Sequence, residues 1–378
     1  MRILALNMGS TGLKAGSFDA DSNGGLHKLG ASTIEARHDS TTGAHRIDAL
    51  LEELARSAFI ESEPDIVTHR FVHGGDREGT ALLTPDELAS LEALCTLAPL
   101  HQAPELALAR SALQRWPKCQ HIAVFDTCWH RTMPDEHRRL ALPEALHARG
   151  VRRYGFHGLA FASGIARVAD ITPHLVGGRI VLAHLGGGSS LCAIREQISV
   201  NTTMGLTPLG GIAMATRPGS LDPGVVLHLQ RTLRMSNEEI DHLLWRNSGL
   251  LGMSGESGDM RRLLASDASS ARCAVAVYVT LAAQGIAAMA ACIGGIDVLG
   301  FSGGIGQNAA AVRERICAQL DWMGIRLDPA ANQTHRTDAS AGDAAVRTLI
   351  LPIDEEQEMA REAIHWLRQP PTRQSTSA

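Results

Sequence analysis

Five side chains in this sequence have types suited to phosphate chemistry, and they follow apolar runs or stand in glycine-rich surroundings. Asn7, Asp126 and Glu355 carry oxygens of the kind that Mg²⁺ takes, together with waters and the phosphates of a nucleotide. Arg70 and Arg217 add positive charge for an anionic ligand. Phosphoryl transfer needs such a set, because positioning and charge neutralisation supply most of its catalysis. Each residue alone also has a structural explanation, such as helix capping by Asp126.

The stretch Arg179–Ile194 (RIVLAHLGGGSSLCAI) predicts two strands joined by a glycine turn. Glycines let backbone amides approach an anion because no Cβ intervenes, and Ser189 and Ser190 add hydroxyl donors. Residues 1–19 repeat the pattern, with a small-residue turn at 9–12 between apolar segments. We interpret the two stretches as a duplicated phosphate-binding hairpin, although an ordinary turn in a buried sheet also explains either copy alone.

Other segments predict the elements that position these residues. The Gly-, Thr- and Pro-rich segment 201–224 is too apolar for disorder and predicts a functional loop. Asp297–Arg315 predicts a strand, a glycine-rich turn and a helix whose N-terminus faces a phosphate or an adenosine group. Residues 348–368 predict a strand followed by an amphipathic helix, and the tail from Gln369 is expected to be disordered.

Composition bounds the class of protein. A chain of 378 residues with 44% hydrophobic residues predicts two domains with a cleft between them. A net charge of −5 without a Lys/Arg block argues against nucleic-acid partners. Seven scattered cysteines without a CxxC pair, and an N-terminus without signal-peptide architecture, predict a cytoplasmic protein. The uncharged run Cys273–Ile296 is rich in Ala and Gly, which favours a buried helix over a membrane span.

Motifs in a fixed order resemble a known family. They are LNMGSTGLK, HRFVHGG, LAPLH, VFDTCWHRTMP, RRYGFHG, AHLGGGSS, TTMGLTPL with TRPGSLDPG, SGLLGMSGESGDMR, SGGIGQN and PIDEEQEMAREA. Together they are similar to the acetate kinase (acetokinase) family, within the sugar kinase, heat-shock protein and actin superfamily. The resemblance implies an α/β chain with a duplicated ribonuclease H-like (actin-like ATPase) two-domain fold and an inter-domain cleft. Residues 1–127 plus 356–378 would form an N-terminal acyl-substrate and metal domain, and 128–355 a C-terminal nucleotide-binding domain.

The resemblance also implies roles for individual residues. Metal ligation falls to Asn7 and Glu355, and catalysis to Asp126, His157 and Arg217. Substrate binding falls to Arg70, Val72, Leu100, His101, Phe156 and Pro208. Nucleotide binding falls to Lys14, to His184, Leu185, Gly186, Gly187 and Gly188, to Asp259, Met260 and Arg261, and to Gly304, Ile305, Gly306, Gln307 and Asn308. We interpret Asp126 as orienting metal-bound water or substrate rather than as a base, because a substrate carboxylate is already ionised at neutral pH.

The implied function is acetate kinase, which reversibly transfers the γ-phosphoryl group of ATP to acetate and gives acetyl phosphate and ADP. Mg²⁺ is the expected cofactor, with Mn²⁺ as a substitute, and a homodimer without a membrane partner is the expected assembly. Propionate kinase is the close alternative, because one methylene is worth only about 1 to 3 kcal/mol of discrimination. A pyrophosphate-linked enzyme and a non-catalytic nucleotide-binding homologue are further alternatives. The family usually has Asn where Gly187 stands, and Glu at the positions of Gln307 and Gly210, so the departures gather on the nucleotide side.

Overall fold

The computed structural model describes residues 1–9, 12–35, 43–56 and 63–369, and these divide into two compact units. Unit 1 comprises Met1–Trp129, Gly158–Ser163 and Asp354–Ala378, and unit 2 comprises His130–His157 and Gly164–Ile353. The sequence prediction has no return of the chain to the first unit at 158–163. Ser10 and Thr11 of the predicted N-terminal turn, and the tail beyond Gln369 that is expected to be disordered, lie outside the described residues.

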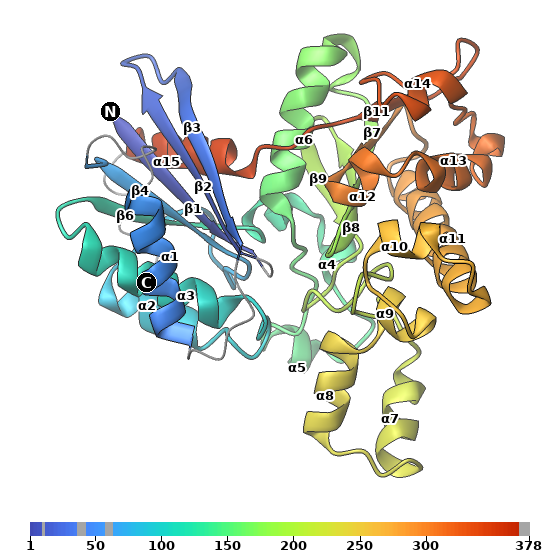
Figure 1. Cartoon of the computed structure of the whole chain (residues 1–378), viewed down its shortest axis with the longest axis horizontal. Helices are drawn as coiled ribbons and strands as arrows, with labels where there is room; N and C mark the ends of the chain where they lie inside the picture. The colour runs from blue at the N-terminus through green and yellow to red at the C-terminus, as the bar shows by residue number, and fades with distance from the viewer. Residues whose placement is uncertain (10–11, 36–42, 57–62, 370–378) are drawn as a thin grey trace. The chain divides into compact units, whose positions relative to one another are not determined.

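Unit 1 is built on a six-stranded sheet with the order β3-β2-β1-β4-β6-β5 (Figure 1). Strand β2 pairs antiparallel with both β1 and β3, whereas β1, β4 and β6 run parallel, and β5 is antiparallel to β6. The strand bounds are β1 Arg2–Met8, β2 Gly12–Ala20, β3 Leu26–Glu35, β4 Ile66–Phe71, β5 Ala81–Leu82 and β6 Gln120–Phe125.

Helices cover both faces of this sheet, because the side chains of β1 alternate between two cores. Leu4 and Leu6 pack with residues of α1 (Gly43–Arg56) and α3 (Gln102–Arg115). Ile3 and Ala5 pack with residues of α15 (Glu355–Leu367), so the C-terminal helix lies on the N-terminal sheet. The period of two expected of a strand thus places consecutive residues on opposite faces.

Unit 2 is built on a five-stranded sheet with the order β11-β10-β7-β8-β9. Its bounds are β7 Arg179–Leu185, β8 Ser189–Arg195, β9 Ile198–Thr202, β10 Val298–Ser302 and β11 Arg347–Ile350. Strands β7, β8 and β9 form an antiparallel meander, and β10 is parallel to both β7 and β11. Read from its outer antiparallel strand, β9-β8-β7-β10-β11 repeats the order β3-β2-β1-β4-β6 of unit 1. The internal duplication predicted from the two hairpins is therefore confirmed as a repeated sheet.

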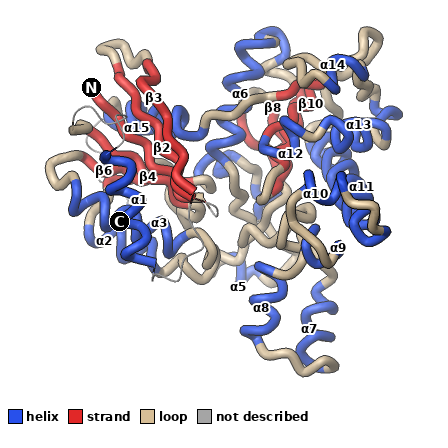
Figure 2. Tube along the Cα trace, viewed as in Figure 1, coloured by secondary structure: helices blue, strands red, loops and turns tan. Residues whose placement is uncertain are grey.

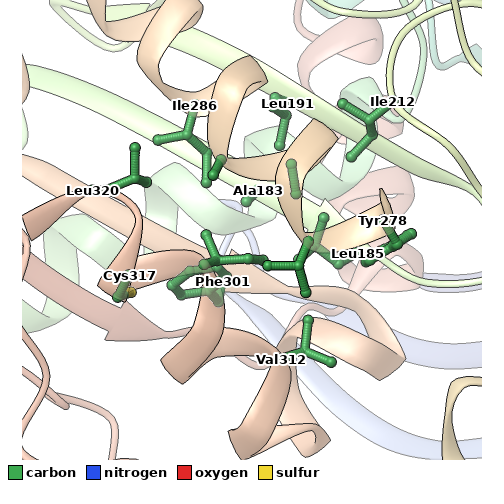
Figure 3. Close-up of a cluster of buried hydrophobic side chains, with 14 of the residues drawn as sticks. Ala183, Leu185, Leu191, Ile212, Tyr278, Ile286, Phe301, Val312, Cys317 and Leu320 are labelled. Carbon is green, nitrogen blue, oxygen red and sulfur yellow. The ribbon is translucent and has the colours of Figure 1, made fainter. Parts of the chain in front are cut away.

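The core of unit 2 lies between this sheet and α11 (Ser269–Cys292), with α13 (Ala310–Ala318) beside them (Figure 3). Tyr278 and Ile286 of α11 meet Leu185 and Phe301 of the sheet. Helix α11 contains most of the uncharged run that is expected to form a buried helix; an 18-residue window of it has a mean hydropathy of 1.8 and is half buried within the structure. Its length and composition alone would suit a membrane span, but its buried residues make it the core helix of this unit.

The remaining helices connect and cover these layers (Figure 2). Helix α6 (Gly158–Ile171) begins in unit 1, where the Gly158 N–H donates to the Asp126 carbonyl oxygen (3.1 Å). The others are α2 Pro85–Glu92, α4 Asp135–Arg138, α5 Glu144–His147, α7 Pro223–Arg231, α8 Asn237–Arg246, α9 Gly249–Ser254, α10 Met260–Ala265, α12 Gly303–Asn308 and α14 Pro329–Gln333. Short 3₁₀ turns span Cys128–Thr132, Pro173–Leu175 and Asp321–Met323.

Candidate active site

Arg70 and Asp126 form a buried ion pair at the carboxyl edge of the sheet in unit 1. Arg70 lies near the end of β4, and Asp126 directly follows β6, the parallel neighbour of β4. The Arg70 Nε donates to Asp126 Oδ1 (3.2 Å) and Nη2 to Oδ2 (2.6 Å), while the side chains are 10% and 1% exposed. Parallel strands end at the same edge of a sheet, which is where open α/β sheets bind ligands.

The charge of Arg70 is secured by its surroundings. Burial lowers the pKa of the Arg70 guanidinium, but the carboxylates of Asp126 and Glu355 outweigh this and raise its pKa overall. Two-point guanidinium–carboxylate contacts are also among the strongest hydrogen-bonded pairs in proteins. Arg70 is therefore a permanent cation in a site with little solvent.

Asn7 extends this pair toward the first turn of α15. Its Oδ1 accepts from Arg70 Nη1 (3.0 Å), and its Nδ2 donates to Glu355 Oε2 and Glu356 Oε1, both at 2.8 Å. Burial and the neighbouring Glu355 raise the pKa of Glu356. The structure thus unites Asn7, Arg70, Asp126 and Glu355, which the sequence could only name separately. Lys14 lies opposite Asn7 in the register of β1 and β2, and its side chain is exposed.

The oxygens around Asn7 fit a hard divalent cation. The nearby carboxylates of Glu355 and Glu356 lie against the Asn7 amide, and no imidazole or thiol belongs to this set. Within the described ranges, no group of three or more His, Cys, Asp or Glu residues has the geometry of a metal site. Mg²⁺ takes one or two carboxylates plus waters and substrate phosphates, so this donor set suits Mg²⁺ and does not suit zinc.

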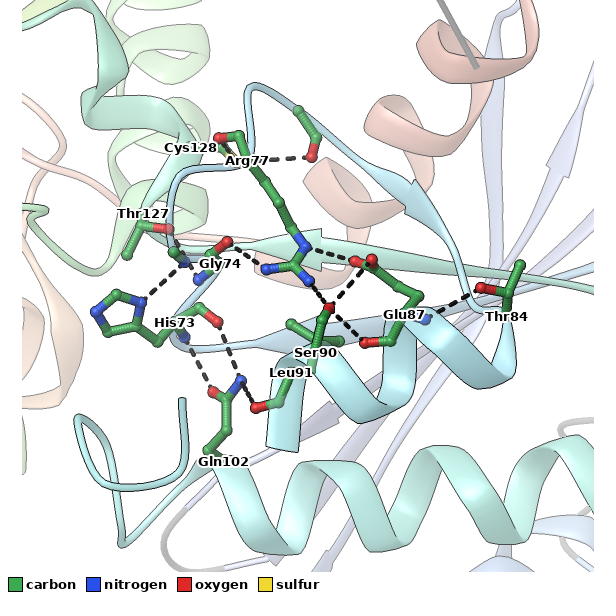
Figure 4. A network of polar contacts seen from close by, with 12 residues as sticks. His73, Gly74, Arg77, Thr84, Glu87, Ser90, Leu91, Gln102, Thr127 and Cys128 are labelled. Atoms are coloured by element: carbon green, nitrogen blue, oxygen red, sulfur yellow. Dashed lines mark hydrogen bonds and ion pairs between the residues drawn. The ribbon is translucent and has the colours of Figure 1, made fainter. Parts of the chain in front are cut away.

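The turn that follows Arg70 is held by a network of polar contacts that sequence reasoning missed (Figure 4). Gln102 contacts both peptide groups of His73, since its Oε1 accepts from the His73 N–H (3.2 Å) and its Nε2 donates to the carbonyl (3.0 Å). The Gly74 N–H donates to Thr127 Oγ1 (3.1 Å). Arg77 donates to the Gly74 carbonyl (2.8 Å), pairs with Glu87 of α2 (2.5 Å) and contacts Ser90. The turn beside the ion pair is therefore rigidly supported.

The predicted acyl-pocket residues are divided between the units. Val72 is buried and Leu100 and His101 are half-buried in unit 1, whereas Phe156 and Pro208 are buried in unit 2. The Phe156 carbonyl contacts His130 Nε2 (2.9 Å), and the Pro208 carbonyl accepts from Arg217 Nη1 (2.8 Å). The backbone carbonyls of Phe156 and Pro208 thus make their hydrogen bonds within unit 2.

In unit 2, the turn Gly186–Gly188 between β7 and β8 is surrounded by the other predicted residues. A Cβ built on Gly188 would lie 2.7 Å from Arg217 Nη2 and 3.1 Å from His157 Nε2, so both groups approach this glycine. A Cβ on Gly186 would lie 3.7 Å from the Gly304 nitrogen at the start of α12. The Gly187 carbonyl accepts from the Ala215 N–H (3.2 Å). Hence each glycine contacts a different part of the site.

Arg217 is a buried cation without a carboxylate partner in the described part of the chain. Its side chain is 7% exposed, and burial lowers its pKa to about 10, which leaves it charged at neutral pH. Its Nη1 donates a hydrogen bond to the uncharged Pro208 carbonyl. A desolvated guanidinium of this kind favours an anionic ligand, because buried charges are stable only when they are paired.

Two histidines lie side by side near this cation. His157, with a left-handed backbone (φ 59°), contacts Ser190 Oγ through Nδ1 (2.8 Å). His184 contacts Ser302 Oγ through Nδ1 (3.2 Å), and the two rings are 4.8 Å apart. The serine contact at Nδ1 leaves Nε2 as the nitrogen that His157 presents beside Gly188 and Arg217.

The expectation that Ser189 and Ser190 donate to an anion is wrong in this structure, because both hydroxyls are buried in protein contacts. Ser189 Oγ contacts the Gly186 N–H and the Tyr278 hydroxyl, both at 3.1 Å, which fixes the turn. Ser190 orients His157. Leu185 and Met260 are predicted to contact the nucleotide. Their side chains lie in the hydrophobic core, so only their backbone groups remain for such a contact.

The remaining predicted nucleotide residues start or form two short helices. Asp259 caps α10 by accepting from the Arg261 N–H (2.9 Å), and it pairs with the exposed Arg261 guanidinium (2.6 Å). In α12, Asn308 Nδ2 donates to the Gly304 carbonyl (2.9 Å). A Cβ on Gly258 would lie 2.9 Å from the Ala215 carbonyl, which connects the start of α10 to the residue that contacts Gly187.

Arg313, which sequence reasoning did not select, holds the end of α12. Its guanidinium donates to the carbonyls of Gly306 and Gln307, to the side-chain and backbone oxygens of Asn332, all at 2.8 Å, and to His335 Nδ1 (3.0 Å). These five acceptors match the five N–H groups of an arginine. The side chain is fully buried, so the segment Gly304–Asn308 rests on an internal anchor.

Comparisons with known proteins agree with this architecture. The model of the acetokinase family matches residues 2–361. The acetate kinase of Methylocella silvestris is 41% identical over 344 residues, covering 90% of this chain and 85% of that protein. The acetate kinase of Rhodopseudomonas palustris is 39% identical over 384 residues, covering 95% and 96%. Among solved structures, a propionate kinase from Francisella tularensis gives a TM-score of 0.84 at 29% identity, covering 96% and 98%. The Porphyromonas gingivalis acetate kinase gives 0.82 at 31% identity, covering 97% and 100%.

Proposed function

Because this chain belongs to the acetokinase family, we propose that it is an acetate kinase that transfers the γ-phosphoryl group of ATP to acetate. The reaction is reversible and gives acetyl phosphate and ADP. The observation that carries the proposal is the buried, carboxylate-free guanidinium of Arg217 beside His157 Nε2 at Gly188, within the described residues. Such a pair neutralises the oxygens of a transferring phosphoryl group, which is the main requirement of this chemistry.

The acid substrate is assigned to Arg70. Acetate is already ionised at neutral pH, so the obstacle is the repulsion between two anions and no strong base is needed. Arg70 donates through Nε and one hydrogen on each terminal nitrogen to Asp126 and Asn7. One hydrogen on each terminal nitrogen is then left for a substrate oxygen. Asp126 keeps this guanidinium in place, which makes it an orienting group rather than a base.

Mg²⁺, with Mn²⁺ as a substitute, is assigned to Glu355 and Asn7, with the Glu356 carboxylate beside them. When bound, the cation supplies charge neutralisation to the nucleotide phosphates. Its binding also relieves the repulsion between the two neighbouring carboxylates, which contributes to the raised pKa of Glu356. Lys14, opposite Asn7 on β2, adds positive charge for the same phosphates.

ATP is assigned to unit 2. Two segments lie at the turn Gly186–Gly188. The segment Gly304–Asn308 approaches Gly186 directly, and the start of α10 at Asp259 is connected to Gly187 through Ala215. His184 lies beside His157 at the same turn.

A homodimer in the cytoplasm is the proposed state of the protein. Helix α7 has no buried residue, and the exposed apolar side chains on it and beside it are Leu221, Val225, Leu227 and Leu233. A second copy of the chain is the partner that would cover such a surface. Sedimentation of the purified chain tests this assembly, and a monomer at micromolar concentration would contradict it.

A matrix of donors and acceptors tests the function. Hydroxylamine traps acyl phosphates as hydroxamates, so the purified chain is assayed with ATP or pyrophosphate against acetate, propionate and butyrate. Product with ATP and acetate supports the proposal, and the relative rates rank the acids. The likeness to a solved propionate kinase makes propionate the acceptor to compare first. ATP binding without any product would instead favour a non-catalytic nucleotide-binding protein. Product formed only with pyrophosphate would favour pyrophosphate as the phosphoryl donor.

A further inference from the structure

The first turn of α3 holds the two residues that follow β4. Strand β4 ends at Phe71, so sheet pairing no longer fixes Val72 and His73. Gln102 contacts both peptide groups of His73, and the Val72 N–H donates to Glu105 Oε2 (2.9 Å). These two side chains are fully buried, at 0% and 1% exposure. The backbone beside Arg70 is therefore set by side chains of α3.

Glu105 has surroundings that disfavour a negative charge. Its Oε1 atom is buried and has no hydrogen-bond partner among the described residues, and its Oε2 receives only the Val72 N–H. The nearby cation, Arg70, already makes its two-point contact with Asp126. A buried ionised carboxylate with one unsatisfied oxygen is costly, whereas a neutral carboxyl needs less solvation.

The neighbouring charges point the same way. Burial raises the pKa of Glu105 to about 8; Arg70 and the Val72 N–H oppose this rise, and Asp126 adds to it. Titratable neighbours on the adjoining elements are His73 after β4, His101 before α3, and the Arg77–Glu87 pair joining the turn to α2. The charged groups that act on Glu105 are Arg70 and Asp126, and their opposite charges cancel. An ionised Glu105 would therefore give these three side chains a net negative charge.

We propose that Glu105 is a positioning residue of the acyl site that works as a neutral carboxylic acid. It holds the Val72 backbone beside Arg70 without adding a negative charge where a substrate carboxylate binds. This inference rests on the proposed function. When Glu105 ionises, its charge repels the substrate anion and competes with Asp126 for Arg70, so the acid binds more weakly while the fold persists.

The test compares Glu105→Gln with wild type and Glu105→Ala. Glutamine keeps an acceptor for the Val72 N–H and cannot ionise, so it mimics the neutral acid. Alanine removes the acceptor. Glu92→Gln, at an exposed position of α2, is the matched control for removal of a carboxylate. Acyl hydroxamate formation is measured at saturating ATP. The acetate concentration is varied at each of several pH values between about pH 7 and pH 9, and thermal unfolding of each variant confirms folding.

Wild type and Glu92→Gln are expected to show a rise of about tenfold in KM for acetate across this range, because the neutral fraction falls tenfold per pH unit above the pKa. Glu105→Gln is expected to have a wild-type KM at pH 7, within about twofold, and no alkaline rise. Glu105→Ala is expected to raise KM about tenfold at pH 7, with a smaller effect on kcat.

Two results would overturn the inference. One is an alkaline rise in Glu105→Gln equal to that of wild type. The other is a folded Glu105→Gln that loses as much activity at pH 7 as Glu105→Ala, which would mean that the ionised form is needed. Failure of the proposed function is distinguishable, because wild type would then form no acyl phosphate at any pH.

Discussion

Asp126 holds the Arg70 guanidinium through two hydrogen bonds at once, at 3.2 Å and 2.6 Å, from the end of the neighbouring parallel strand. Both oxygens of the carboxylate therefore face the arginine. This relationship defines Asp126 as the residue that orients and neutralises the cation proposed to bind the acid. It also gives an aspartate at the end of β6 a role in a proposed reaction that requires no base.

The first prediction concerns this pair. Asp126→Asn removes the charge that balances a buried guanidinium, and breaking a buried pair costs about 3 to 5 kcal/mol. We expect kcat/KM for acetate to fall about 100-fold or more, measured by hydroxamate formation. Asp135→Asn, in an exposed pair with Arg139, is the control and should leave activity unchanged. Near-normal turnover of folded Asp126→Asn would exclude an essential role for the pair.

The second prediction concerns Gly188. An alanine Cβ there would lie 2.7 Å from Arg217 Nη2 and 3.1 Å from His157 Nε2, so the proposed phosphoryl-binding groups must move. Gly188→Ala is expected to lower kcat at least about tenfold, since small displacements of catalytic groups are costly. Gly177→Ala, whose Cβ meets nothing within 4 Å, is the matched control. Equal kcat in the two folded variants would remove Arg217 and His157 from the chemistry.

The third prediction concerns Gly187. A Cβ at this position meets nothing within 4 Å, so the asparagine usual in the family fits without a clash. If the turn binds ATP, Gly187→Asn supplies an additional hydrogen-bonding group and should lower KM for ATP severalfold with kcat for acetate little changed. An unchanged or higher KM for ATP would count against placing the nucleotide at this turn.

The fourth prediction concerns stability in acid. Burial lowers the pKa of His130 to about 4, partly opposed by its contact with the Phe156 carbonyl; burial also lowers the pKa of His69 and His121. The unfolded chain binds these protons below about pH 6.5 and the folded chain does not, so stability is present above pH 6.5 and is lost as pH falls toward 4. His130 alone accounts for roughly 3 kcal/mol of this loss. Melting temperatures measured across this range should fall less steeply for His130→Gln, and an identical slope would contradict the assignment.

The sequence predicts those features that depend on local pattern. The apolar segment Ile3–Leu6 predicts β1, and the repeated hairpin predicts the duplicated sheets. The Asp259 cap is also local, because its acceptor and donor lie two residues apart. In each case the determining contacts are between near neighbours along the chain or follow from a periodicity.

Features that depend on contacts between distant segments could not be predicted in this way. Glu105 meets Val72 across 33 residues, and Arg313 meets Asn332 across 19, so their burial follows only from the packing of helices on sheets. The residue type and turn of Ser190 predict a contact with an anion, but the fold places its hydroxyl against His157. The return of Gly158–Ser163 to unit 1 depends likewise on the contact between Gly158 and Asp126.

The most direct test of the central claim follows the oxygen that forms the new bond. Phosphorus NMR is recorded on acetyl phosphate made by the purified chain from Mg·ATP and acetate labelled with oxygen-18 in the carboxylate. Attack of the carboxylate on the γ-phosphorus predicts acetyl phosphate with the label in the bridging position, together with ADP in equal amount. Formation of AMP and pyrophosphate, or acetyl phosphate without a labelled bridge, would contradict direct phosphoryl transfer to the acid.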